Sequence, residues 1–151
     1  MREVMGNFLI DGVRIMDTLY RFNGSVYSDL SLIKGFLDSA IMDLNPYITD
    51  QEKLFDIKVI LNELVINGAV HGNQEDLNKK VCLKLVLKDD SLKIIVSDEG
   101  RGVDHDTSLY DCGEKKCNGR GLLIVEALTD QLILNQNEVI AIKNLWRPGD
   151  L

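Results

Sequence analysis

Three polar side chains recur at four-residue spacing within residues 55–73. They are Glu63, Asn67 and His71, and on an α-helix this spacing places them on one face. The rest of the stretch is apolar nearly all round, which predicts a buried helix. A buried carboxylate and amide need partners. The pattern favours Glu63 as a general base and Asn67 as an oxygen ligand for Mg²⁺, although a structural pair bonded to the backbone remains open.

A glycine turn follows the second of two predicted strands. Asp98 stands at the end of the strand, and Gly100 and Gly102 come after it. Alternating glycines allow the backbone to approach a flat ring closely. The Asp98 carboxylate could then accept a hydrogen bond from an exocyclic amine such as that of adenine. The alternative is a plain β-turn with no ligand.

A second glycine turn, residues 119–122 (Gly-Arg-Gly-Leu), opens another predicted helix. Backbone N–H groups at a helix N-terminus can bind phosphate, and the helix dipole favours the anion. The alternative is a helix start whose glycines serve tight packing. The turn is not a Walker A loop, which requires G-x-x-x-x-G-K-[ST].

Two helices are expected to position the first motif. Ser28 is predicted to cap the earlier helix. Thr49 and Glu52 form a T-x-x-E capping box at the start of the long helix. This helix is predicted to run to about His71, with Gly72 as a left-handed C-terminal residue.

Strands are expected to supply the other layer. Asp98 shares the parity of the apolar side chains before it, so its carboxylate should face the layer that covers the sheet. Residues 103–118 form a polar loop whose length is typical of a functional lid. The order of elements predicts an α+β two-layer sandwich with a mixed, mainly antiparallel sheet and helices on one face. The remaining predicted elements are a strand or hairpin over 7–16 turning at Asp11-Gly12, a strand over 18–22 ended by Asn23-Gly24, strands over 81–88 and 92–98, a helix over 119–129, and a closing hairpin over 131–134 and 139–145.

Length and charge narrow the classes of partner. A chain of 151 residues fits one domain, and a formal charge of −7 argues against nucleic acid or an anionic membrane as partner. The sequence contains neither a signal peptide nor an apolar run of about 20 residues, so a cytoplasmic location is expected. Cys82, Cys112 and Cys117 are interpreted as reduced thiols.

The three motifs together resemble the GHKL ATP-binding superfamily, which has the Bergerat-type fold and includes gyrase-type ATPases and histidine kinases. The resemblance spans roughly residues 20–145, with residues 103–118 at the position of the ATP lid. The matching positions are Glu63 and Asn67 for the N box, Asp98, Gly100 and Gly102 for the first glycine box, and Gly119 and Gly121 for the second.

Within the superfamily the chain is most similar to bacterial anti-sigma-factor serine kinases, on the wording ELVINGAVHGN, SDEGRG and GRGLLIVEALTD. The resemblance implies that Glu63 activates a serine on a small anti-anti-sigma (STAS-type) partner. It also implies binding of a sigma factor and formation of a homodimer. The implied ligands are ATP and Mg²⁺, with Asn67 holding the metal ion, Asp98 reading adenine beside Gly100 and Gly102, and Gly119, Arg120, Gly121 and Leu122 cradling phosphate.

One difference from the family pattern leaves a second function open. Relatives often carry a Gly-Thr pair in the last hairpin that helps to hold adenine through water, and this chain has Asn137-Glu138-Val139 instead. The alternative function is therefore a module of the same fold that binds nucleotide or a partner without phosphotransfer. Glu63 favours the kinase, because a pure binding site has no need of a base there.

Overall fold

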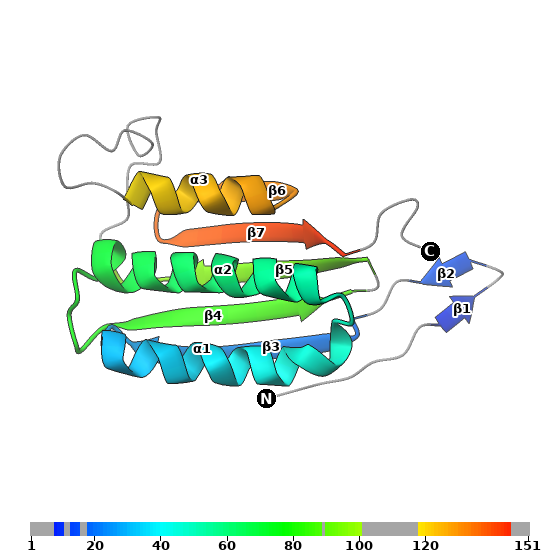
Figure 1. The fold of residues 1–151 in the computed structure, drawn as a ribbon, viewed down its shortest axis with the longest axis horizontal. Helices are drawn as coiled ribbons and strands as arrows, with labels where there is room; N and C mark the ends of the chain where they lie inside the picture. Colours follow the sequence, from blue (N-terminus) through cyan, green and yellow to red (C-terminus); the bar gives the residue numbers. More distant parts are fainter. Residues whose placement is uncertain (1–7, 11–12, 16–17, 89, 101–117, 146–151) are drawn as a thin grey trace.

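A five-stranded sheet with three helices on one face forms the body of the molecule (Figure 1). The structure is a computed structural model that describes residues 8–10, 13–15, 18–88, 90–100 and 118–145. The strand order is β3-β4-β5-β7-β6, and every pair of neighbours is antiparallel. The elements in chain order are β1 (Phe8–Ile10), β2 (Val13–Ile15), β3 (Tyr20–Tyr27), α1 (Leu30–Leu44), the 3₁₀ turn η1 (Asn45–Tyr47), α2 (Gln51–Asn67), the π-helical turn η2 (Gly68–Gly72), β4 (Lys80–Leu87), β5 (Ser91–Ser97), α3 (Asn118–Leu128), β6 (Gln131–Leu134) and β7 (Glu138–Asn144).

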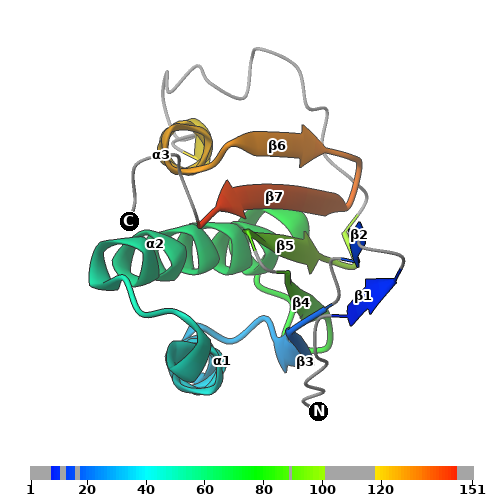
Figure 2. The same cartoon turned by 90° about the vertical axis from the view of Figure 1, so that its right-hand side faces the viewer.

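The helices and the sheet form two layers, as predicted. Helix α1 packs near β3, α2 lies over the centre of the sheet and α3 lies beside β6 and β7 (Figures 1 and 2). Alternation along β4 and β5 sends Leu83, Leu85, Leu92 and Ile94 into the core, where none of them is exposed. The α+β sandwich and the antiparallel pairing of β4 with β5 are therefore confirmed.

The closing hairpin is present as predicted, and residues 8–15 form a hairpin, one of the two alternatives predicted for this segment. Strands β1 and β2 pair antiparallel, and the Asp11-Gly12 turn between them lies outside the described residues. Strands β6 and β7 form the closing hairpin around residues 135–137. No helix in the described part of the chain is long and apolar enough to cross a membrane.

The prediction that Asn23-Gly24 ends a strand is wrong. Strand β3 runs through this pair to Tyr27, because its whole length pairs with β4. A Cβ atom at Gly24 would lie 3.0 Å from the Phe22 ring and 3.1 Å from the Phe36 ring. The glycine therefore makes room for two aromatic rings and does not turn the chain.

The cap of α1 is displaced by one residue from the prediction. Asp29 is the N-cap, and its carboxylate accepts the Ser31 N–H at 3.0 Å. The predicted cap, Ser28, is buried, and its hydroxyl donates to the Lys79 carbonyl at 2.9 Å. Ser28 is thus used to join α1 to the start of β4.

The capping box predicted for α2 is also wrong by one residue. Asp50 caps the helix and accepts the N–H groups of Glu52 and Lys53 at 2.9 and 3.3 Å. A carboxylate at this position stabilises the helix start as the Thr49 hydroxyl would, and it also complements the dipole.

Helix α2 differs from the prediction at its end and in its burial. It stops at Asn67 and widens into η2, so Gly72 is not a left-handed cap. Positive φ angles occur later, at Gln74 (54°) and Glu75 (55°). The helix is not buried all round either, since Phe55 is 64% exposed.

Several predicted features lie outside the described residues. They are Gly102 of the first glycine turn and the lid up to residue 117, with Cys112 and Cys117.

Candidate functional site

Helices α2 and α3 are in close contact at three of the predicted residues. A Cβ atom at Gly121 would lie 2.6 Å from Glu63 Oε2 and 3.3 Å from Asn67 Nδ2. Gly121 is buried and stands in the first turn of α3. Because glycine has no side chain, the start of α3 can rest directly on the polar face of α2. The structure thus brings the first predicted motif and the second glycine turn together.

Asn67 carries an unsatisfied polar group. Its Nδ2 atom is buried and has no hydrogen-bond partner among the described residues. A buried donor without an acceptor costs about 1–3 kcal/mol. This observation weakens the structural alternative, in which the amide would be bonded to the backbone. An acceptor brought by a ligand would satisfy the group.

The Asp98 carboxylate faces the helix layer, as its parity predicted. It lies against Gly72, where a Cβ atom would overlap both carboxylate oxygens. The Gly100 N–H donates to Asp98 Oδ1 at 2.9 Å, and Gly100 itself packs against the Gly72 carbonyl. Two glycines are therefore required for η2 and the turn after β5 to meet.

Asn137 also belongs to this site, although little in the sequence indicates its role. Its carbonyl accepts the Asp98 N–H at 2.9 Å. Its side-chain amide donates to the Gly100 carbonyl and, at 3.4 Å, to Asp98 Oδ1. In the sequence, Asn137 stands out only by its position in the closing hairpin, at the place expected for a Gly-Thr pair.

Asn73 is a second residue that sequence reasoning missed. It is 1% exposed, and its amide donates to the Ser28 hydroxyl at 2.8 Å and to the Lys80 carbonyl at 3.0 Å. Its side-chain oxygen accepts the Glu99 N–H at 2.7 Å. Asn73 therefore fixes the turn after β5 to the ends of β3 and η2. A single asparagine after a helix carries no signal for such a role.

The other predicted residues occupy different settings. Gly119 and Arg120 lie in the first turn of α3, and the Arg120 side chain is exposed. Leu122 is 6% exposed, so its side chain belongs to the core and only its backbone is available to a ligand. His71 lies in η2, where partial burial lowers the pKa of its imidazole. Its neutral form is therefore favoured, and the structure assigns it no contact with Glu63.

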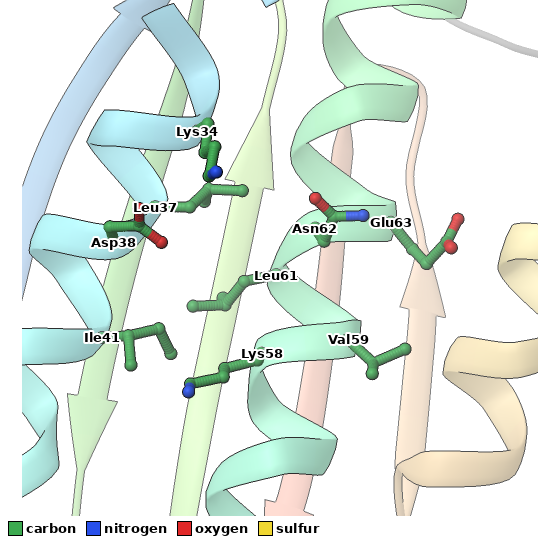
Figure 3. A pocket seen from close by; sticks show the side chains of 9 residues that line it. All are labelled: Lys34, Leu37, Asp38, Ile41, Lys58, Val59, Leu61, Asn62 and Glu63. Carbon is green, nitrogen blue, oxygen red and sulfur yellow. The ribbon is translucent and has the colours of Figure 1, made fainter.

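A cavity of about 400 Å³ lies between α1 and α2 (Figure 3). Lys34 and Asp38 line it from α1, and Lys58 and Asn62 line it from α2. Glu63 is at its edge, but Figure 3 shows the Glu63 carboxylate turned away from the cavity, toward α3. Asp98, Gly100 and Gly121 do not line it. This groove is therefore distinct from the site formed by the glycine turns.

Comparison with known proteins gives the family. Residues 37–143 match the model of the histidine kinase-like ATPase domain. An anti-sigma F factor from Oceanobacillus iheyensis is 33% identical over 113 residues, which cover 72% of this chain and 75% of the relative. An anti-sigma F factor from Shouchella clausii is 37% identical over 107 residues, covering 68% and 71%. The chain belongs to the anti-sigma-factor kinase family of histidine kinase-like ATPase domains.

A more distant member of this family is called a kinase. The serine-protein kinase RsbW of Listeria monocytogenes is 26% identical over 100 residues, which cover 60% of this chain and 64% of the relative. Membership in an ATPase domain family implies that the chain binds nucleotide.

The residues of the site fit a nucleotide with Mg²⁺. The Asn67 side chain lies next to the Glu63 carboxylate and carries an amide oxygen of the kind that Mg²⁺ prefers. Its unpaired Nδ2 atom is a hydrogen-bond donor, which suits a phosphate oxygen. In the described part of the chain, no group of three or more His, Cys, Asp or Glu side chains could hold a metal ion.

Proposed function

We propose that this chain is an ATP-dependent protein serine kinase that phosphorylates a small anti-anti-sigma (STAS-type) partner and also binds a sigma factor as a homodimer. The observation that carries the kinase assignment is the contact between α2 and α3. It places the Glu63 carboxylate and the unpaired, buried Nδ2 atom of Asn67 against the first turn of α3. The N-terminus of a helix is suited to bind phosphate. The names of the relatives, anti-sigma F factor and serine-protein kinase, support the choice of partners.

Each residue has one task in this proposal. Glu63 accepts the proton of the serine hydroxyl as the hydroxyl oxygen attacks the γ-phosphorus of ATP, and the bond from that phosphorus to the bridging oxygen breaks to release ADP. Asn67 holds Mg²⁺, which neutralises charge on the phosphates when bound. Asp98 accepts a hydrogen bond from the exocyclic amine of adenine, with Gly100 and Gly102 leaving room for the ring. A final group, the backbone of residues 119–122, cradles phosphate.

Positioning accounts for most of the expected catalysis. Transfer in line needs the nucleotide and the hydroxyl at fixed places, and little covalent chemistry from the protein. The close packing of Gly121 on Glu63 and Asn67 joins the phosphate-binding turn to the base and to the metal ligand. A shift of α3 would therefore disturb all three at once.

A non-catalytic nucleotide- or partner-binding module is the second candidate. The observation that favours it is the sequence Asn137-Glu138-Val139 at the place of the Gly-Thr pair. Several relatives are named anti-sigma factors without mention of kinase activity. In this alternative the chain holds nucleotide and a partner, and Glu63 removes no proton.

Phosphotransfer to the partner separates the two candidates. The protein is incubated with labelled ATP, Mg²⁺ and, in turn, each small STAS-type protein of the same organism. Glu63→Gln should lower the rate of labelling of the partner serine about 100-fold or more. It should leave the affinity for ATP within about twofold of the wild-type value. Glu126→Gln, an exposed carboxylate on α3, is the matched control and should label normally. ATP binding without labelling of any candidate partner would establish the binding module instead.

A further inference from the structure

The turn between β6 and β7 lies directly beside the turn that carries Asp98. Asn137 contacts its neighbour through both main chain and side chain. The Asn137 carbonyl accepts the Asp98 N–H at 2.9 Å. The Asn137 side-chain amide donates to the Gly100 carbonyl and to Asp98 Oδ1, the latter at 3.4 Å. One residue thus holds the backbone of Asp98, its carboxylate and the glycine two positions later.

The acceptors fix the orientation of the Asn137 amide. A carbonyl oxygen and an ionised carboxylate can only accept hydrogen bonds, so the NH₂ group must be the part of the amide that faces them. Asp98 Oδ1 also accepts the Gly100 N–H at 2.9 Å. Two donors from different segments therefore converge on one carboxylate oxygen.

These hydrogen bonds restrain the Cβ–Cγ torsion of Asp98. The terminal torsion of an aspartate is broad, so an unsupported carboxylate rotates about its Cβ–Cγ bond. With Oδ1 held by Gly100 and Asn137, and with the carboxylate packed on Gly72, its plane has a defined direction. A carboxylate of defined direction can distinguish an N–H donor from an acceptor on a ring edge.

We propose that Asn137 is a positioning residue for purine specificity, which sets the Asp98 carboxylate to accept a 6-amino group and to reject a 6-oxo group. The inference rests on the proposed function, in which Asp98 reads the base. A 6-oxo purine would set its carbonyl oxygen against the fixed carboxylate and leave both acceptors without a donor, which a site built on hydrogen bonds rejects strongly. The side chain at position 137 thus acts on the base through Asp98.

Relative affinity for two nucleotides tests this role. ATP and inosine triphosphate, which differ in the group at position 6 of the purine, are titrated by calorimetry into the wild-type protein, Asn137→Ala and Asn137→Ser. Neither substituted side chain reaches both acceptors. The preference for ATP should fall about tenfold in each variant, the value of one hydrogen bond to a charged group. Affinity for inosine triphosphate should stay within about twofold.

Asn135→Ala is the matched control in the same turn, because the contact of Asn135 with Glu138 uses its main chain. It should retain the full preference for ATP. Equal losses for both nucleotides in the Asn137 variants, or an unchanged preference, would overturn the inference. Wild-type protein that binds neither nucleotide would overturn the proposed function instead. Thermal unfolding of each variant shows that the folded protein is compared in every case.

Discussion

Gly121 is the point at which the candidate site depends on a single missing side chain. The first turn of α3 touches the Glu63 carboxylate and the Asn67 amide only because position 121 has no Cβ atom. The proposed base and metal ligand are thus held next to the backbone that would bind phosphate. The sequence shows the glycine but not which side chains it meets.

Gly121→Ala should therefore damage the site. The new methyl group would lie 2.6 Å from Glu63 Oε2, so either the carboxylate or the start of α3 must move. ATP affinity, measured by calorimetry, should fall at least about tenfold, because a shift of about 1 Å in such a site is costly.

Gly35→Ala provides the comparison for this variant. Nothing lies within 4 Å of a Cβ atom there, and the residue is an exposed position of α1. This substitution should leave ATP affinity unchanged and raise the free energy of unfolding by about 0.5–1 kcal/mol, since alanine favours a helix over glycine. Equal affinities in the two variants would contradict the role of Gly121.

Residues near in sequence were predictable, and residues joined only by the fold were not. The four-residue spacing of Glu63 and Asn67 and the parity of Asp98 are local patterns, and both were read correctly from the sequence. The contact of Asp98 with Asn137 joins positions 39 apart. Asn73 in turn bonds to the Ser28 hydroxyl across 45 positions. No local period encodes such pairs.

At the level of elements, Lys143 of β7 connects the sheet to both helices of the candidate site, α2 and α3. Lys143 lies on the inner face of β7 and is 4% exposed. Its Nζ atom donates to the Leu128 carbonyl in the last turn of α3 at 2.8 Å. It also pairs with Asp56 Oδ2 of α2 at 3.3 Å. The positive charge suits the C-terminus of α3.

Replacement of this lysine should loosen the helix layer. Lys143→Met retains the aliphatic stem but leaves the Leu128 carbonyl and the Asp56 carboxylate without their donor. Because Asp56 is partly exposed and can be solvated, we expect a loss of about 1–3 kcal/mol in the free energy of unfolding. Urea denaturation measures this loss directly.

Lys93→Met is the matched control on β5. Lys93 is exposed on the face of the sheet that bears no helix, so its replacement should change the free energy of unfolding by less than about 0.5 kcal/mol. If the two lysine variants were equally stable, the proposed fastening of α2 and α3 would be wrong.

The elements themselves were predicted better than their ends. Alternation fixed β4 and β5 within one residue, because one face of each strand is buried. The observed N-caps of α1 and α2 each lie one residue after the predicted cap. In both helices an aspartate follows the predicted serine or threonine, and aspartate is an equally good N-cap residue. At the start of η2, a Cβ atom on Gly68 would lie 3.2 Å from Val81 of β4, a tertiary contact without a local sequence signal.

At the scale of the whole molecule, the antiparallel strand order gathers four distant segments at one end of the sandwich. The end of α2, the turn after β5, the start of α3 and the β6–β7 turn all lie at the same end (Figure 1). Contacts already join them in pairs, through Gly121 on Glu63 and through Asn137 on Asp98. A nucleotide bound there would link segments from the middle and last thirds of the chain.

Binding of ATP with Mg²⁺ should therefore stabilise the whole fold. At a ligand concentration of 100 times Kd the gain is about 2.7 kcal/mol, which corresponds to an increase in Tm of roughly 5–10 °C for a domain of this size. Scanning calorimetry with and without nucleotide measures the shift.

The increase should depend on Asn67, because its amide oxygen is the proposed metal ligand and its buried Nδ2 atom has no hydrogen-bond partner among the described residues. Asn67→Ala should lose most of the nucleotide-dependent shift and still fold. Asn62→Ala removes an exposed amide from the same helix and should retain the full shift. An equal shift in both variants would show that nucleotide binds without Asn67 and would remove the proposed metal ligand from the site.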